Sequence, residues 1–139
     1  MRTLLLVGTL AGLAVAGDRT ADPLVGKWEV LSVIRGDMPD NDMRGAIREH
    51  LFGGKYTVTP PAGSKTPPVG GTYTVDDTKK PPQVDMMPDN GKYKGQTLKG
   101  VYKVDGDSLV IAFAEPGQPR PKDTEPKPDR VVATHKRAK

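Results

Sequence analysis

Two histidines are the residues of this sequence best suited by type to proton transfer or metal binding. His50 and His135 lie far apart in the chain, and no paired spacing brings either one next to a second metal ligand. Cysteine is absent, which excludes thiolate metal sites, disulfides and a cysteine nucleophile. A serine–histidine pair would need a nucleophile elbow, and no such motif occurs. We therefore expect structural or surface roles for both histidines, and we predict no catalytic residue and no metal site.

Clustered acidic residues are a second group that could carry chemistry. Asp105-Gly106-Asp107 resembles the start of a calcium loop, but no bidentate glutamate follows at the required distance. Similar clusters occur at 37–42, 76–77 and 123–125. Aspartate is common in turns because its side chain bonds the local backbone. Turn formation is therefore the preferred interpretation of all four clusters.

Methionine thioethers could bind Cu(I) in an exported protein. Four of the methionines are Met38, Met43, Met86 and Met87. Packing in the core or at its rim is the preferred interpretation, because methionine fills irregular apolar gaps and one of the adjacent pair must face inward on a strand. The sequence thus predicts no cofactor.

Five aromatic residues are the candidates for ligand binding. Four of them stand in a repeated Gly-x-aromatic-x-Val pattern, found at 26–30, 54–58, 71–75 and 100–104. Because strand side chains alternate, this spacing puts the ring and the valine on one face. Small barrels either fill their interior or hold a ligand there. We therefore expect the ligand-binding residues to be Trp28, Tyr56, Tyr73, Tyr102 and Phe113, with a fully packed core as the alternative.

Turn residues divide the chain into the short elements that must position these rings. Clusters of glycine, proline and aspartate separate seven predicted strands. The fifth and sixth strands form a hairpin across Asp105-Gly106-Asp107. The strands are expected at 27–34, 55–59, 71–75, 83–87, 97–104, 108–114 and 131–135.

One helix is predicted near Asp40–Leu51. Met43, Ala46, Ile47 and Leu51 recur there at helical spacing, and an aspartate or asparagine can cap its start. Its apolar stripe needs a partner, which one mouth of a barrel would supply.

Seven short strands and one short helix indicate a mainly β fold, either an antiparallel barrel or a sandwich. We expect a lipocalin-like barrel of about seven to eight strands, with the helix after the first strand. The predicted interior holds Trp28, Val30, Tyr56, Val58, Tyr73, Val75, Leu98, Tyr102, Val104, Leu109, Ile111 and Phe113.

Residues 1–16 have the pattern of a secretory signal peptide. Arg2 supplies a positive charge, an apolar run follows at 4–13, and Ala14-Val15-Ala16 is a small-x-small cleavage signature. The run is too short to span a membrane as a mature helix, and a buried N-terminal helix is the alternative. No cysteine follows the cleavage signature, so a bacterial lipoprotein anchor is excluded. We predict one soluble domain at 17–139, exported to the periplasm or secreted.

Composition and charge narrow the classes of partner. The 16 glycines and 14 prolines among 139 residues fall at strand starts, in turns and in two Pro-rich loops at 60–68 and 115–130. The formal net charge is +4, but lysines mostly alternate with acids, and only 135–139 is a basic cluster. A nucleic-acid-binding surface would interleave a basic face with stacking aromatics. We predict no nucleic-acid partner and no membrane span.

Several motifs carry a family resemblance. Gly26-x-Trp28 is similar to the start motif of lipocalin-like, or calycin, proteins. The order of stretches at 24–30, 71–76, 79–85, 91–102, 105–109 and 114–121 resembles a family of small exported domains of uncharacterised function, abundant in planctomycete bacteria. The resemblance covers nearly the whole chain after the signal peptide, except that 122–126 lacks an expected aromatic. It implies a lipocalin-like barrel with an extracytoplasmic location, and it implies no established reaction.

These observations predict a non-catalytic protein that binds a small apolar or amphipathic ligand inside its barrel. The alternative is a filled barrel, a structural or protein-interaction module that acts through its Pro-rich loops. The expected partner is accordingly a small apolar ligand or an extracytoplasmic protein. An enzyme is the third and least favoured hypothesis.

Overall fold

The fold is built almost entirely from β-strands. A computed structural model describes residues 22–139, so the predicted signal peptide at 1–16 lies outside the described residues. A 3-10 helix at Asn41–Met43 is the only helical element in that range, and none there is long and apolar enough to cross a membrane. The strands are β1 (Gly26–Arg35), β2 (Met38–Pro39), β3 (Ile47–Leu51), β4 (Lys55–Thr59), β5 (Val69–Asp76), β6 (Gln83–Pro88), β7 (Leu98–Asp105), β8 (Ser108–Ala114) and β9 (Arg130–Arg137).

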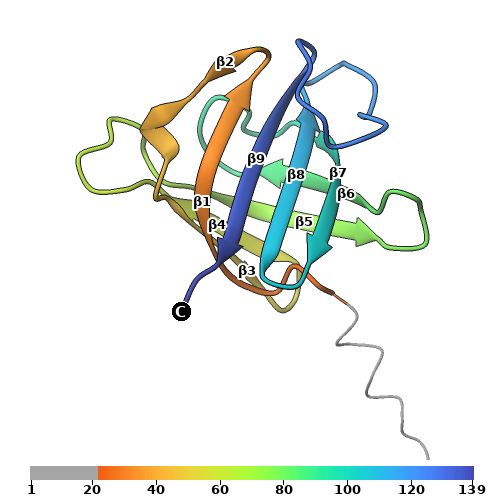
Figure 1. Cartoon of the computed structure of the whole chain (residues 1–139), viewed down its shortest axis with the longest axis horizontal. Helices are drawn as coiled ribbons and strands as arrows, with labels where there is room; N and C mark the ends of the chain where they lie inside the picture. Colours follow the sequence, from red (N-terminus) through yellow and green to blue (C-terminus); the bar gives the residue numbers. More distant parts are fainter. Residues whose placement is uncertain (1–21) are drawn as a thin grey trace, which may run out of the picture.

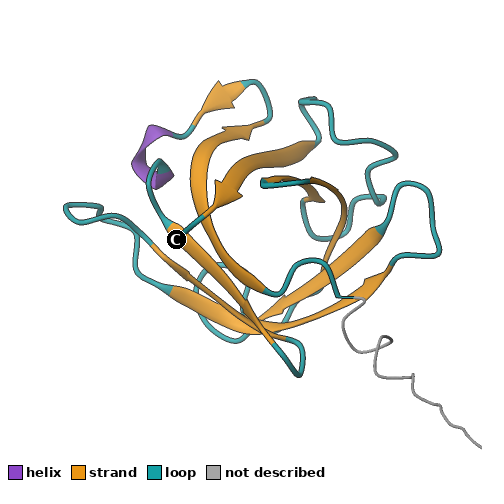
Figure 2. Cartoon of the chain, turned by 60° about the horizontal axis from the view of Figure 1, so that its bottom comes forward, coloured by secondary structure: helices purple, strands orange, loops and turns teal. Residues whose placement is uncertain are grey.

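The strands form one antiparallel sheet that closes on itself. Its order is β2-β1-β3-β4-β5-β6-β7-β8-β9, and β1 also pairs with β9. On one side, residues 26–29 of β1 pair with β3; on the other side, residues 28–35 pair with β9, with a register shift between Val30 and Ser32. The two-residue β2 pairs antiparallel with the last two residues of β1 and lies outside the barrel closure. The result is a closed antiparallel barrel of eight strands (Figures 1 and 2), which confirms the predicted barrel.

The repeated Gly-x-aromatic-x-Val pattern marks the inward faces, as predicted. Trp28, Tyr56, Tyr73 and Tyr102 are all buried, with exposed fractions of 4% or less. The valine two positions after each ring belongs to the same core or packs against it. Two predicted strands, 55–59 and 108–114, coincide with β4 and β8.

The prediction of a helix near Asp40–Leu51 is wrong. Only a single 3-10 turn forms there, and Asp40 caps it by accepting a hydrogen bond from the backbone N–H of Asp42 at 3.1 Å. Gly45 then adopts a φ of +90°, a left-handed conformation that interrupts any helix. Residues 47–51 continue as β3, paired on both sides with β1 and β4.

The physical reason for this error is the identity of the inward residues of β3. Arg48 and His50 are the positions of β3 that point into the barrel and are buried. Because both are polar, the period-two pattern typical of a strand has no apolar signal there. The pairing on both sides then outweighs the helical spacing of the neighbouring apolar residues.

One end of the barrel is packed shut. The Trp28 indole N–H donates to the Leu24 carbonyl at 3.0 Å, and the Tyr73 hydroxyl donates to the Asp22 carboxylate at 2.7 Å. The Arg137 guanidinium stacks on the Trp28 ring, 3.9 Å from its centroid. Gly26 permits this approach, because a Cβ there would lie 2.9 Å from the Arg137 guanidinium. The chain before β1 and the end of β9 together close this end.

The segment at 115–129 packs on the outer wall of the barrel. Val101, Ala112 and Val132 form a small buried cluster on that wall, and Arg120 and Pro121 lie beside Val101. Arg120 Nη1 donates to the carbonyls of Val84 and Gly100. This Pro-rich segment, which joins β8 to β9 in Figure 1, is therefore fastened to the scaffold.

Candidate functional site

A cavity opens at the end of the barrel opposite Trp28. Its volume is about 180 Å³, and its wall combines residues from all eight barrel strands with the 3-10 turn and the loop between β6 and β7. The antiparallel register brings the ends of β1, β4, β6 and β8 next to the starts of β5, β7 and β9 at this mouth. Most of the wall is apolar, and its apolar residues include Val30, Val33, Val58, Val69, Leu98 and Phe113.

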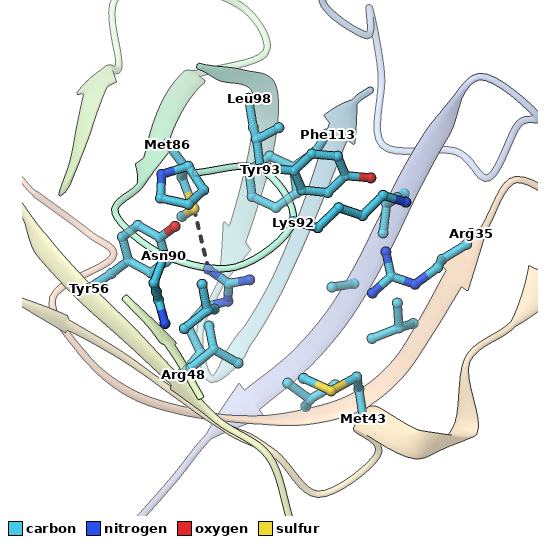
Figure 3. Close-up of a pocket in the computed structure, with 17 residues that line it drawn as sticks. Arg35, Met43, Arg48, Tyr56, Met86, Asn90, Lys92, Tyr93, Leu98 and Phe113 are labelled. Atoms are coloured by element: carbon cyan, nitrogen blue, oxygen red, sulfur yellow. Dashed lines mark hydrogen bonds between the residues drawn. The ribbon is translucent and has the colours of Figure 1, made fainter. Parts of the chain in front are cut away.

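Arg48 contributes the one deeply buried charge of this wall (Figure 3). The residue is 9% exposed, and β3 directs it inward between Trp28 of β1 and Val58 of β4. Its guanidinium carbon lies 5.9 Å from the ring centroid of Tyr56 and 5.8 Å from that of Phe113. Burial lowers the pKa of Arg48 to about 10, so the side chain stays cationic at neutral pH.

His135 holds the Arg48 side chain in place. Arg48 Nε donates to His135 Nε2 at 3.2 Å, and Arg48 Nη1 donates to the Met86 sulfur at 3.4 Å. His135 Nδ1 lies 3.1 Å from the Leu109 carbonyl, so the proton sits on Nδ1 and Nε2 is left to accept. Burial, followed by the Arg48 charge, lowers the pKa of His135 to about 3. The imidazole is therefore neutral at physiological pH.

His50 lies behind Arg48, toward the closed end. Its ring stands edge-on to Tyr73, with the centroids 4.5 Å apart. Burial, the Arg48 charge and His135 lower the pKa of His50 to about 2. Within residues 22–139, both ring nitrogens of His50 and the hydroxyl of Tyr102 have no hydrogen-bond partner. The core between cavity and closed end is thus packed and partly polar.

The rim of the cavity adds two further cations. Arg35 pairs with Asp40 at 2.9 Å, whereas the Lys92 ammonium lies 5.2 Å from the ring centroid of Tyr93. The Tyr93 hydroxyl donates to Glu115 at 2.5 Å, which ties the β6–β7 loop to the residue after β8. Within residues 22–139, no aspartate or glutamate lines the cavity. The arrangement therefore offers apolar contact and positive charge.

The structure divides the five predicted ligand-binding residues into two groups. Tyr56 and Phe113 line the cavity. Trp28, Tyr73 and Tyr102 are equally buried, but they pack below the cavity, in the core toward the closed end. Sequence spacing identified inward-facing rings correctly, yet it contained no information about where along the barrel axis the packing ends.

Sequence reasoning missed Arg48 and the rim residues. Arg48 falls within the predicted helix at Asp40–Leu51, where a charged residue would be exposed to solvent. One available signal was the Gly53-Gly54 pair, which can serve as a hairpin turn before the strand at 55–59. A hairpin there makes 47–51 a strand and turns Arg48 and His50 to the same face as Tyr56.

Comparison with known proteins gives this chain no relative from which a function could be transferred. No protein-family model, no curated protein and no solved structure matches it.

Proposed function

We propose that this chain is an exported, lipocalin-like barrel that binds a small apolar or amphipathic molecule without chemically changing it. The observation that carries this proposal is the open, apolar cavity in a barrel that is otherwise packed. A barrel filled only for stability would close both ends with side chains, because unfilled apolar space weakens a core. This barrel closes one end and leaves the other open.

The lipocalin-like character is supported by sequence and topology together. Gly26-x-Trp28 opens β1, and the eight barrel strands follow one another around the barrel in chain order, up and down. Eight-stranded up-and-down barrels of this kind include the lipocalins, which hold one small ligand. Export is supported by the signal-peptide pattern at 1–16.

The cavity volume limits the size of the ligand. An apolar cavity of roughly 150 Å³ holds a benzene molecule, and the cavity here is about 180 Å³. Pockets for drug-sized molecules are larger, from roughly 300 Å³ upward. The enclosed part of the ligand is therefore about the size of one ring or a short alkyl chain, and a longer tail would leave through the mouth.

The alternative, an interaction module that acts through the Pro-rich loops, gains no specific support over ligand binding. Arg120 and Arg130 fasten the 115–129 segment to the barrel: Arg130 Nη1 pairs with Asp123 at 2.7 Å, and Arg120 bonds two strand carbonyls. These contacts give the segment a structural role on the outer wall.

Blocking the cavity tests the proposal. Val69 and Val75 are both half-buried on the inward face of β5, but only Val69 lines the cavity. We expect benzyl alcohol and 1-octanol to bind the wild type saturably, as measured by ligand-observed NMR and thermal shift. Val69→Phe should weaken binding by about tenfold or more, because the ring fills the mouth, whereas the matched variant Val75→Phe should bind as the wild type does.

Equal binding to both variants would place the ligand elsewhere and refute the proposed site. The proposed function itself would be refuted if the wild type bound none of four probes saturably: benzyl alcohol, 1-octanol and the carboxylic acids of matching shape, benzoate and octanoate.

A further inference from the structure

Arg48 is a buried cation without a countercharge in the described structure. Among residues 22–139, the ion pairs join other residues, and none includes Arg48. Removing an ion from water costs several kcal/mol unless a partner compensates it. His135 is neutral and a thioether is a weak acceptor. The rings of Tyr56 and Phe113 attract the cation but carry no negative charge, so the groups around Arg48 supply no countercharge. A residue serving stability alone would be apolar here.

The contacts of Arg48 leave one edge of the guanidinium free. The group carries five N–H donors in a planar fork. His135 takes the Nε donor and Met86 takes one on Nη1. Within residues 22–139, these are the side-chain hydrogen bonds that Arg48 donates, so one donor on Nη1 and two on Nη2 remain. Two adjacent nitrogens with free donors match the two oxygens of a carboxylate, which such a fork binds in bidentate fashion.

The cavity leads to this edge through apolar walls. Figure 3 shows Arg48 pointing toward Met86, while Arg35 and Met43 lie on the other side of the cavity. Phe113 and the valines surround the space between them. Because a low-dielectric surrounding strengthens charge pairing, a single negative charge gains most at this depth. Lys92 at the rim adds positive potential on the way in.

We propose that the cavity selects small monocarboxylic acids and binds them head-inward, with the carboxylate paired to Arg48 and the apolar body against Phe113 and the valines. This inference rests on the proposed function and narrows its ligand class. One buried cation matches one negative charge, and the cavity volume matches a single ring or a short chain. His135 acts as a positioning residue, since its Nε2 fixes the direction of the guanidinium.

The test compares acids with neutral molecules of the same shape. Isothermal titration calorimetry at neutral pH measures the dissociation constants, and benzoate is compared with benzyl alcohol and octanoate with 1-octanol. The wild type should bind each acid about tenfold to a hundredfold more tightly than its alcohol, the range expected for a charge-assisted hydrogen bond. Arg48→Met should remove this preference and keep alcohol binding. Lys92→Met, which removes a cation at the rim, should keep most of the preference.

Equal affinity of acid and alcohol in the wild type would overturn this inference while leaving the proposed function intact. Failure of all four probes to bind would instead overturn the proposed function. A preference that survives in Arg48→Met would also overturn the assignment of Arg48. If that variant does not fold, the side-chain ¹⁵N–¹H signals of Arg48 in the wild type decide. Benzoate must shift them and benzyl alcohol must not, and the absence of a benzoate shift refutes the pairing.

Discussion

At the scale of single residues, the unusual feature of this barrel is its polar interior. Arg48, His50 and His135 are all buried, and two of them have pKa values far below that of a free histidine. Such groups cost stability when they must carry charge in an apolar surrounding. Their burial gives the protein a pH-dependent stability and gives the cavity its charge.

The depressed histidine pKa values predict that the fold weakens in acid. An unfolded chain protonates histidine near pH 6.5, whereas the folded protein protonates His135 only near 3 and His50 near 2. The unfolded state therefore binds more protons between these values. The free energy of unfolding is at its full value above about 6.5 and falls as the pH drops through this window.

Urea unfolding from pH 7 to pH 4 measures this effect. Each histidine should cost about 2 kcal/mol of stability at pH 5 relative to pH 7. His50→Phe removes a titrating ring that makes no hydrogen bond to residues 22–139, so the loss in acid should shrink by that amount. Thr57→Val, on the exposed face of the neighbouring strand β4, should keep the wild-type slope. A slope unchanged in His50→Phe contradicts the burial of a neutral His50.

Single residues differ in how far sequence patterns predict their place in the structure. The inward direction of Tyr56 and Phe113 follows from period two alone. The role of Arg48 does not, because a buried charge has no signature in hydrophobic patterning. Its environment is assembled by strands that are distant in sequence, such as β9, which supplies His135.

At the scale of elements, strands with an apolar inward face were predictable and the strand with a polar one was not. β4 and β8 match their predicted bounds because glycine or aspartate turns delimit apolar alternation. β3 was predicted as a helix because its inward positions are Arg48 and His50. The alternation rule assigns the apolar side chains of a strand to its buried face, so it fails in β3, where the buried positions are polar and Ile47 and Leu51 lie on the other face.

The 115–129 segment predicts a stability effect at this scale. Arg120 pairs with Asp85 at 2.7 Å and donates to two strand carbonyls. Arg120→Met should therefore lower the free energy of unfolding by about 1–3 kcal/mol, because these acceptors lose a partner. Lys122→Met, an exposed position of the same segment, should change it by less than about 0.5 kcal/mol. Chemical unfolding monitored by circular dichroism compares the two, and equal stabilities would show that the segment is not fastened through Arg120.

At the scale of the whole molecule, the packing of the barrel interior changes along its axis, from a closed end to an open one. Trp28, Leu24 and Arg137 close the first end, a partly polar layer around His50 and Arg48 fills the middle, and the cavity occupies the other end. The barrel itself was predictable from strand number, turn spacing and the repeated aromatic pattern. Which end stays open was not predictable, because it depends on the three-dimensional fit of side chains from all eight barrel strands.

Mapping a bound ligand on the valine methyl groups tests whether this open end is a ligand-binding site. Val33, Val69 and Val131 line the cavity, whereas Val101, Val110 and Val132 lie in or against the cluster on the outer wall. Methyl NMR spectra of valine-labelled protein are recorded during titration with benzoate and with benzyl alcohol. We expect saturable shifts at the first three valines and none at the second three. Shifts confined to the outer-wall valines, or no shifts with either compound, would contradict this expectation.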